Sequence, residues 1–257
     1  MLWFMKHAPL FVSLAIGIAG CANGGPTSTT GSTSTSEATL ASTTALTSTT
    51  ATTPTTVTTT TLGICTLHPI PAEAVQVQSR GGQDIDGDGT DDTVIGYAVA
   101  ETWFLRVVLG NGSMIEDVVL DQSGISGVKP IGSHDLDDDG RSEVFAVIGE
   151  GAYTQIVGVW TANGCSLDRL LIDGTTPSTF LVGSSVGTIN GISCNRSGDI
   201  EQTFASYLSD DQFEGGSHSY DKTGPATLST GPGTSGFFDP SEAFELGVLD
   251  CPGVSLS

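Results

Sequence analysis

Basic residues are scarce in this sequence. It contains 8 Lys and Arg against 29 Asp and Glu, which gives a formal net charge of -21. Contacts to phosphate depend on Lys and Arg, so this balance argues against nucleic acid as a partner. The composition favours cations as small partners, although a large net charge also serves solubility alone.

The N-terminal region lacks a run long enough to span a bilayer. Its apolar stretch, residues 10–19, follows Lys6 and is typical of the core of a signal peptide. The stretch ends in IAGC at 18–21, which resembles the bacterial lipobox. The resemblance implies that residues 1–20 are removed and that acyl chains on Cys21 anchor the protein to the outer face of the cell membrane. An ordinary signal peptide followed by a chance cysteine is the alternative.

Residues 21–62 contain no aromatic side chain, and Glu37 is their only charge. Thr and Ser dominate this stretch, so it has too little apolar area to offset the entropy cost of ordering the chain. We predict a lipidated Cys21 followed by a disordered stalk, itself a candidate for O-glycosylation. The compact domain is expected to cover residues 63–257, which hold all the other acidic residues.

Zinc-type cysteine spacing is absent. The expected domain has no C-x-x-C pair and no Cys/His pattern of a zinc site. An even number of cysteines in an exported chain favours disulfides instead. Three pairings are possible, and we expect Cys165 with Cys194 and Cys65 with Cys251.

A long amphipathic helical period is also missing from residues 63–257. β-Branched and aromatic runs bounded by Gly, Asn and Asp stand in its place. The clearest are DTVIGYAVA, TWFLRVVLG, SEVFAVIGE and TQIVGVWTA. The Asn-Gly pairs at Asn111 and Asn163 predict hairpin turns, because this pair favours positive φ. We therefore expect an all-β domain.

Two acidic loops repeat at an offset of 51 residues, DIDGDGTDD from Asp84 and DLDDDGRSE from Asp135. The following segments also match, FLRVVLGNGS from Phe104 with IVGVWTANGC from Ile156, and this indicates a structural repeat. Each loop follows the pattern D-x-D-x-D-G-x-x-[DE]. Alternating acids on a tight turn converge on one point, and glycine at the sixth position permits the turn.

Calcium prefers such oxygen-rich sites. The seventh residue of each loop can offer its backbone carbonyl, and the last acid can close the shell. The predicted ligands are Asp84, Asp86, Asp88, Thr90 and Asp92 in the first loop, and Asp135, Asp137, Asp139, Arg141 and Glu143 in the second. Asp91 and Asp138 lie at odd positions and are expected to face solvent.

The loops are not EF-hands. An EF-hand needs a bidentate Glu at position 12, where this chain has Ile95 and Ala146, and each loop leads directly into a strand-like run. The pattern resembles instead the calcium loops of FG-GAP and VCBS repeats, the blade units of integrin α-chain-like β-propellers. This resemblance implies structural Ca²⁺, an adhesion or carbohydrate-binding role, and a small or incomplete propeller-like domain. About three blade repeats are expected, near 81–131, 132–188 and 189–257, the last with a degenerate loop at Ser193–Glu201.

Catalysis has little support in the sequence. Gly183–Gly187 matches the G-x-S-x-G nucleophile elbow, but strand-like residues follow it, and the only later histidine is His218. A small-residue turn is preferred, and no catalytic residue is assigned. The chain is expected to be a cell-surface module that binds a protein or carbohydrate ligand and is not an enzyme. A glycan-active hydrolase with paired carboxylates in a deep cleft is the alternative, and a passive cell-envelope component is a third.

Overall fold

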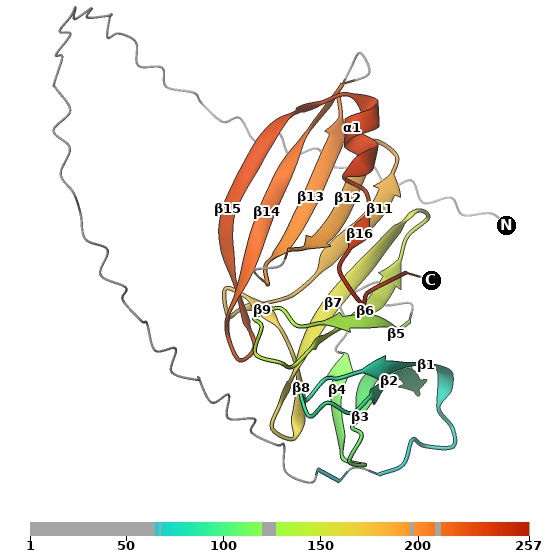
Figure 1. The fold of residues 1–257 in the computed structure, drawn as a ribbon. Helices are drawn as coiled ribbons and strands as arrows, with labels where there is room; N and C mark the ends of the chain where they lie inside the picture. Colours follow the sequence, from blue (N-terminus) through green and yellow to red (C-terminus); the bar gives the residue numbers. More distant parts are fainter. Residues whose placement is uncertain (1–64, 67, 120–126, 196–197, 209–211, 257) are drawn as a thin grey trace, which may run out of the picture. The chain divides into compact units, whose positions relative to one another are not determined.

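The computed structural model describes residues 65–66, 68–119, 127–195, 198–208 and 212–256. The predicted signal peptide, Cys21 and the predicted stalk lie outside these residues. Within them, most of the secondary structure is antiparallel β-sheet (Figure 1), which confirms the expected β-rich domain. No helix in this part of the chain is long and apolar enough to cross a membrane.

The first sheet has four strands that pair in chain order. They are β1 (Val75–Gln83), β2 (Asp92–Val99), β3 (Thr102–Val108) and β4 (Met114–Val119). The first acidic loop joins β1 to β2. The turn predicted at Asn111 joins β3 to β4, and Gly112 has a φ of 84° there, in the left-handed region that glycine tolerates.

The next four strands repeat this arrangement within a larger sheet. They are β5 (Lys129–His134), β6 (Glu143–Glu150), β7 (Thr154–Asn163) and β8 (Ser166–Arg169). The second acidic loop joins β5 to β6, and the turn predicted at Asn163 joins β7 to β8. In both four-strand units, the second strand begins at the last acid of the loop, Asp92 or Glu143.

The rest of the larger sheet contains the longest strands, which lie side by side in Figure 1. Strand β11 pairs with the first half of β7, and β8 pairs with its second half. Beyond β11, the sheet continues through β12, β13, β14, β15, β9 and β10. The remaining elements are β9 (Leu171–Ile172), β10 (Thr176–Pro177), β11 (Phe180–Ser185), β12 (Thr188–Cys194), β13 (Ile200–Tyr207), β14 (Phe213–Gly224), β15 (Thr227–Phe238), α1 (Pro240–Glu245) and β16 (Leu249–Asp250).

The short helix α1 departs from the all-β expectation. Asp239 caps it by accepting a hydrogen bond from the backbone N–H of Glu242, and the Glu242 side chain accepts one from the Asp239 N–H. Pro240 occupies the first turn, where its missing N–H costs nothing. These capping residues are the sequence signal of a helix that is too short to show an amphipathic period.

Two loops that the sequence singled out each join a pair of antiparallel strands. The Gly183–Gly187 segment joins the antiparallel strands β11 and β12, so it is not the strand-to-helix turn of a nucleophile elbow. The degenerate loop belongs to the β12–β13 hairpin, in which Ser193 stands directly opposite Glu201. Its connection is shorter than the two acidic loops.

Strand β6 is buried on both faces. Val144, Ala146 and Ile148 contribute to a core shared with β2, β3, β4 and β8, whereas Phe145 and Val147 pack into a second core with residues of β7, β11 and β12. Double-sided burial explains why this strand reads as a continuous apolar run and not as an alternation. The first core therefore includes residues from both four-strand units.

Trp160 of β7 joins the two units through a hydrogen bond. Its side chain is fully buried, and its indole N–H donates to Asp117 Oδ2 of β4 at 2.8 Å. The guanidinium carbon of Arg169 lies 5.1 Å from the centroid of the Trp160 ring. Burial raises the pKa of the Asp117 carboxyl, and the Trp160 donor opposes that increase.

Replacing Trp160 with Phe is expected to lower the free energy of unfolding by about 1–3 kcal/mol, because the Asp117 carboxylate loses its donor. Denaturant unfolding followed by circular dichroism measures the change. Trp103, which is only partly buried beside the same core, is the matched control. A Trp103→Phe variant that loses as much stability as Trp160→Phe would contradict the role given to the hydrogen bond.

Two disulfides form among the described residues, Cys65–Cys165 and Cys194–Cys251, so the expected pairing is wrong. The Cys65 N–H donates a hydrogen bond to the Ser113 hydroxyl, and the Cys65 carbonyl accepts one from the Met114 N–H, at the β3–β4 turn. Cys165 lies in the equivalent β7–β8 turn, next to Cys65. Strand β16 pairs in parallel with β12, which brings Cys251 to Cys194. Disulfides are typical of extracytoplasmic proteins.

Candidate metal centres

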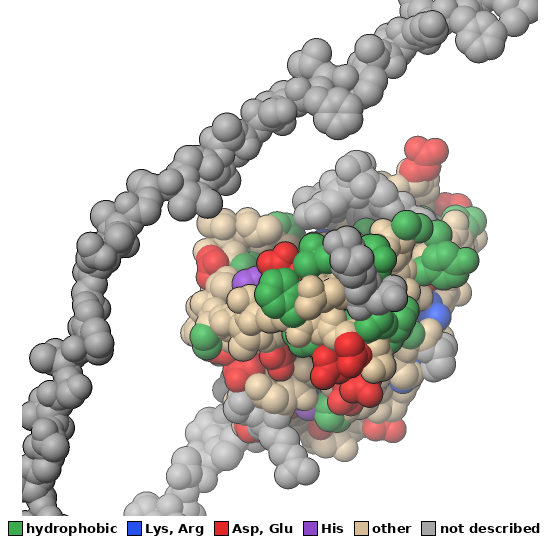
Figure 2. Space-filling view, turned by 90° about the horizontal axis from the view of Figure 1, so that it is seen from above, with side chains coloured by type: hydrophobic (Ala, Val, Ile, Leu, Met, Phe, Trp, Pro, Cys, Tyr) green, Lys and Arg blue, Asp and Glu red, His purple; other side chains and the backbone are tan. Residues whose placement is uncertain are grey.

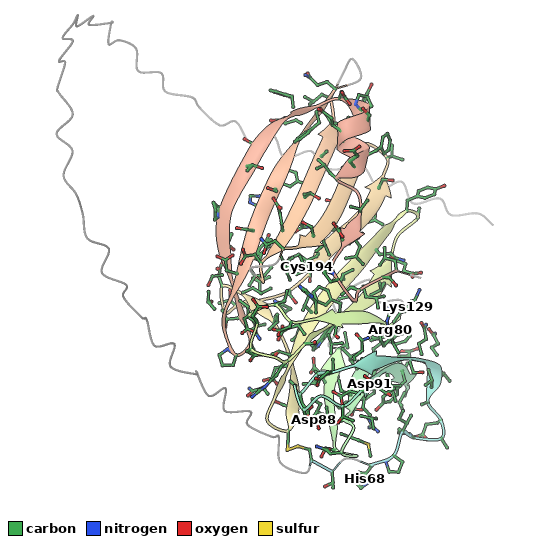
Figure 3. All side chains as sticks on the ribbon, in the orientation of Figure 1. His68, Arg80, Asp88, Asp91, Lys129 and Cys194 are labelled. Carbon is green, nitrogen blue, oxygen red and sulfur yellow. A yellow bond between two sulfur atoms is a disulfide. The ribbon has the colours of Figure 1, made fainter. Side chains whose placement is uncertain are left out.

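The first acidic loop brings three of its predicted ligands together. One carboxylate oxygen from each of Asp84, Asp86 and Asp88 lies within 4.8 Å of the others. Figure 3 labels Asp88, and the neighbouring Asp91, beside the first sheet. Such a group of hard anionic oxygens suits a divalent cation.

Hydrogen bonds within the loop set this convergence. Asp84 accepts from the backbone N–H groups of Gly87 at 2.9 Å and Gly89 at 3.0 Å. Asp88 accepts from the N–H of Thr90 at 2.7 Å. Gly87 and Gly89 have φ values of 73° and 81°, so the turn depends on glycine. The short side chains of Asp reach these neighbouring N–H groups, which is why Asp suits such turns.

Asp86 is the unusual member of the first loop. It is only 2% exposed, and its Oδ2 atom is buried without a hydrogen-bond partner. Its Oδ1 accepts from the Asp88 N–H at 3.2 Å. Burial raises the pKa of the Asp86 carboxyl, and the charges of Asp88 and Asp84 add to the increase. A buried carboxylate oxygen without a donor is costly, and a bound cation would satisfy it.

Asp92 fixes the first acidic loop by accepting hydrogen bonds from two backbone N–H groups. Its Oδ2 accepts from the Ile85 N–H at 2.7 Å and its Oδ1 from the Gly110 N–H at 2.8 Å. Burial raises the pKa of Asp92, and these backbone donors oppose the increase. Asp92 does not belong to the three-residue cluster, so its first role is to hold the β1–β2 connection. The carbonyl of Thr90 stays a predicted ligand.

The second loop also forms a carboxylate cluster, but its last acid takes part in place of its third aspartate. Oxygen atoms of Asp135, Asp137 and Glu143 lie within 4.8 Å of one another. Asp135 accepts from the N–H of Gly140 at 2.9 Å, as Asp84 does from Gly89. Asp139 stays outside the cluster and accepts from the Arg141 N–H at 2.9 Å. The carbonyl of Arg141, like that of Thr90, stays a predicted ligand.

Glu143 makes one hydrogen bond that is equivalent to one of Asp92, and its other oxygen has different partners. Its Oε2 accepts from the Leu136 N–H at 3.0 Å, which corresponds to the Asp92–Ile85 bond. Its side chain is one methylene longer, and Oε1 reaches the Thr161 hydroxyl at 3.0 Å and the ammonium group of Lys222 at 2.6 Å. The last acid of this loop therefore faces the cluster and not only the backbone.

Lys222 is a site residue that the sequence reasoning missed. Its Nζ also lies 3.0 Å from Asp137 Oδ1. Burial lowers the pKa of Lys222, but the carboxylates of Glu143 and Asp137 outweigh it, and the pKa is raised. No sequence pattern connects a lysine on β14 with a loop 79 residues earlier, and only the tertiary structure brings them together.

The two acidic loops lie against each other. The Ser142 N–H donates to the Asp84 carbonyl at 3.3 Å. A Cβ atom at Gly87 would lie 2.5 Å from the carbonyl oxygen of Gly140, so this contact requires glycine. The repeat in the sequence thus becomes a pair of neighbouring clusters in space.

Glu116, a half-buried acid of the first sheet, has structural partners. Glu116 accepts from Arg106 at 2.7 Å and bonds the Tyr97 hydroxyl. Burial raises the pKa of Tyr97 to about 12, with Glu116 adding to the increase. Arg106 also donates to the His68 carbonyl at 2.8 Å, and it thereby ties the start of the described chain to the first sheet.

Comparisons with protein-family models, with curated proteins and with solved structures found no match to this chain. The acidic loops, the disulfides and the N-terminal sequence are the features on which a function can be proposed.

Proposed function

We propose that this chain is a calcium-binding lipoprotein, exported and anchored at the cell surface through Cys21. Its β-repeat domain would act as a structural or ligand-binding module and not as an enzyme. The buried Asp86 Oδ2 atom, which has no donor and belongs to the first carboxylate cluster, carries the proposal. A calcium ion held by Asp84, Asp86 and Asp88 would satisfy it and offset the repulsion among the three charges.

Calcium fits this site better than softer metals. The clusters offer carboxylate oxygens and neither cysteine nor histidine, which suits a hard cation. Extracellular calcium modules bind with dissociation constants on the order of 10⁻⁴–10⁻³ M, and extracellular calcium concentrations fill such sites. The ion would supply charge neutralisation and would hold the β1–β2 connection in one conformation.

The resemblance to FG-GAP and VCBS blades supports a binding role. Both four-strand units carry the acidic loop between their first and second strands, as a blade of that family would. Figure 2 shows many acidic side chains and few basic ones on the face in view, which favours an uncharged or cationic ligand, such as a glycan or a basic protein surface. We propose a propeller-like domain of about three units on a stalk, with the ligand at the cell surface.

Calcium is expected to raise the melting temperature of a fragment of residues 55–257, which contains all the described residues. At about 100 times the dissociation constant, an ion that binds only the native state contributes about 2.7 kcal/mol. For a domain of this size that corresponds to an increase of about 5–10 °C. Calorimetry in chelator and then in 10 mM calcium, which is about 10–100 times the expected dissociation constant, measures it. At the lower ratio the expected increase is about half as large.

Two double variants test whether the clustered acids produce the increase in melting temperature with calcium. The double variant Asp86→Ala, Asp137→Ala is expected to lose the increase. The matched double variant Asp91→Asn, Asp138→Asn removes as many charges from exposed loop positions and is expected to keep it. A melting temperature of the natural sequence that stays constant up to 10 mM calcium would rule out the proposal.

A further inference from the structure

The second acidic loop already contains a cation, supplied by the protein itself. Lys222 Nζ lies 3.0 Å from Asp137 Oδ1 and 2.6 Å from Glu143 Oε1, and both acids belong to the second cluster. The Lys222 side chain is 4% exposed and Glu143 is fully buried. The ammonium group therefore contacts two of the three carboxylates that a divalent ion would bind.

The first loop has no such group. Asp86 occupies the position that Asp137 has in the repeat, and its Oδ2 is buried without a donor. In the described ranges, no Lys or Arg nitrogen lies within 4.0 Å of a first-loop carboxylate. Two loops of the same sequence pattern thus differ in charge balance: the first is uncompensated and the second is partly neutralised.

Lys222 reaches the second loop from the last part of the larger sheet. It lies near the end of β14, two residues before the last residue of the strand, Gly224. A recess beside the loop, lined by Asp137, Asp139, Thr161, Lys222 and Thr223, opens to solvent. The long, flexible lysine side chain has room to leave the carboxylates and enter this recess.

We propose that Lys222 is the resident cation of the second loop and that calcium enters there only by displacing its ammonium group. An ammonium group held between these carboxylates repels a calcium ion and already neutralises part of their charge, so the lysine weakens calcium binding by competition. The first loop then fills at lower calcium concentration than the second. This inference rests on the proposed calcium function and adds a residue that makes the two sites unequal.

Calorimetric titration of the full chain in mild detergent tests the inequality. The natural sequence is expected to bind one calcium ion per chain, with a second at least tenfold weaker. Lys222→Met is expected to strengthen the second site at least tenfold. Asp86→Asn removes the first site, so Asp86→Asn alone should bind weakly, and Asp86→Asn with Lys222→Met should regain one strong site.

Removing Lys222 leaves the buried Glu143 carboxylate without a counter-charge, which destabilises the fold. Amine labelling of the natural sequence therefore tests the displacement of Lys222 by calcium without a variant. Lys129 and Lys222 are the only lysines after residue 20. In chelator, Lys222 is expected to react at least tenfold more slowly than Lys129, as measured by peptide mass spectrometry. Millimolar calcium is expected to raise the reactivity of Lys222 toward that of Lys129.

The possible results separate the two ideas. Two equal calcium sites, with the same Lys222 reactivity in chelator and in calcium, would overturn the role of Lys222 and leave the calcium function intact. Fast labelling of Lys222 in chelator would also overturn its role. Absence of calcium binding in the natural sequence and in Lys222→Met would overturn the proposed function itself.

Discussion

Replacing Cys65 and Cys165 together with serine is expected to lower the free energy of unfolding by about 2–5 kcal/mol. The disulfide closes a loop with a sequence separation of 100 residues, and the entropy of the unfolded chain rises when so large a loop is opened. It also links Cys65, which is hydrogen-bonded to residues of the β3–β4 turn, to the equivalent β7–β8 turn of the second unit. Denaturant unfolding of residues 55–257 under oxidising conditions measures the loss.

The second disulfide provides a matched control. A Cys194→Ser, Cys251→Ser variant removes the same number of cysteines, but its bond holds the C-terminal segment at β12. Hydrogen exchange is expected to increase in β1–β4 for the first variant and in β16 and its neighbours for the second. A first variant within about 1 kcal/mol of the natural sequence, or with unchanged exchange in β1–β4, would show that the buried core alone holds the two units together.

The strands and turns could be predicted because they depend on local patterns. The predicted runs DTVIGYAVA and SEVFAVIGE are rich in β-branched residues, and the structure has β2 and β6 there. The Asn-Gly turns also formed where glycine supplies positive φ. Helix α1 was missed because its signal is a short capping pattern at Asp239 and not a long amphipathic period.

The parts of the fold that could not be predicted depend on long-range contacts. The pairing of Cys65 with Cys165 requires the turns of the two units to be neighbours, and spacing along the chain does not encode that. The approach of Lys222 to Glu143 likewise depends on where β14 enters the sheet. Local patterns predicted the acids that form the two clusters, whereas the charge balance of the second cluster depends on Lys222, which is far away in the sequence.

The last acids of the two loops make different contacts. Both stay predicted ligands that close the metal shell, but Asp92 accepts backbone N–H groups with both oxygens, whereas Glu143 accepts one with Oε2 and turns Oε1 toward Thr161 and Lys222. The difference follows from one methylene group. An Asp and a Glu at the same position of a repeat thus serve the loop differently.

Asp86→Asn is expected to be more stable than the natural sequence without calcium and less stable than it with calcium. In chelator, the variant should be about 1–3 kcal/mol more stable than the natural sequence, because it removes a buried carboxylate whose Oδ2 has no donor. In saturating calcium, the natural sequence should gain about 2.7 kcal/mol or more, and the variant should gain far less at this site. Chemical unfolding of both proteins in each condition measures the two differences.

Asp91→Asn is the matched control for this reversal, because Asp91 is an exposed acid of the same loop outside the cluster. It should change stability by less than about 0.5 kcal/mol in either condition. If Asp86→Asn were less stable than the natural sequence in chelator, the Asp86 carboxylate would have a favourable partner in the metal-free protein. The first loop would then be a self-sufficient turn that needs no calcium, and the reason to place an ion between Asp84, Asp86 and Asp88 would be lost.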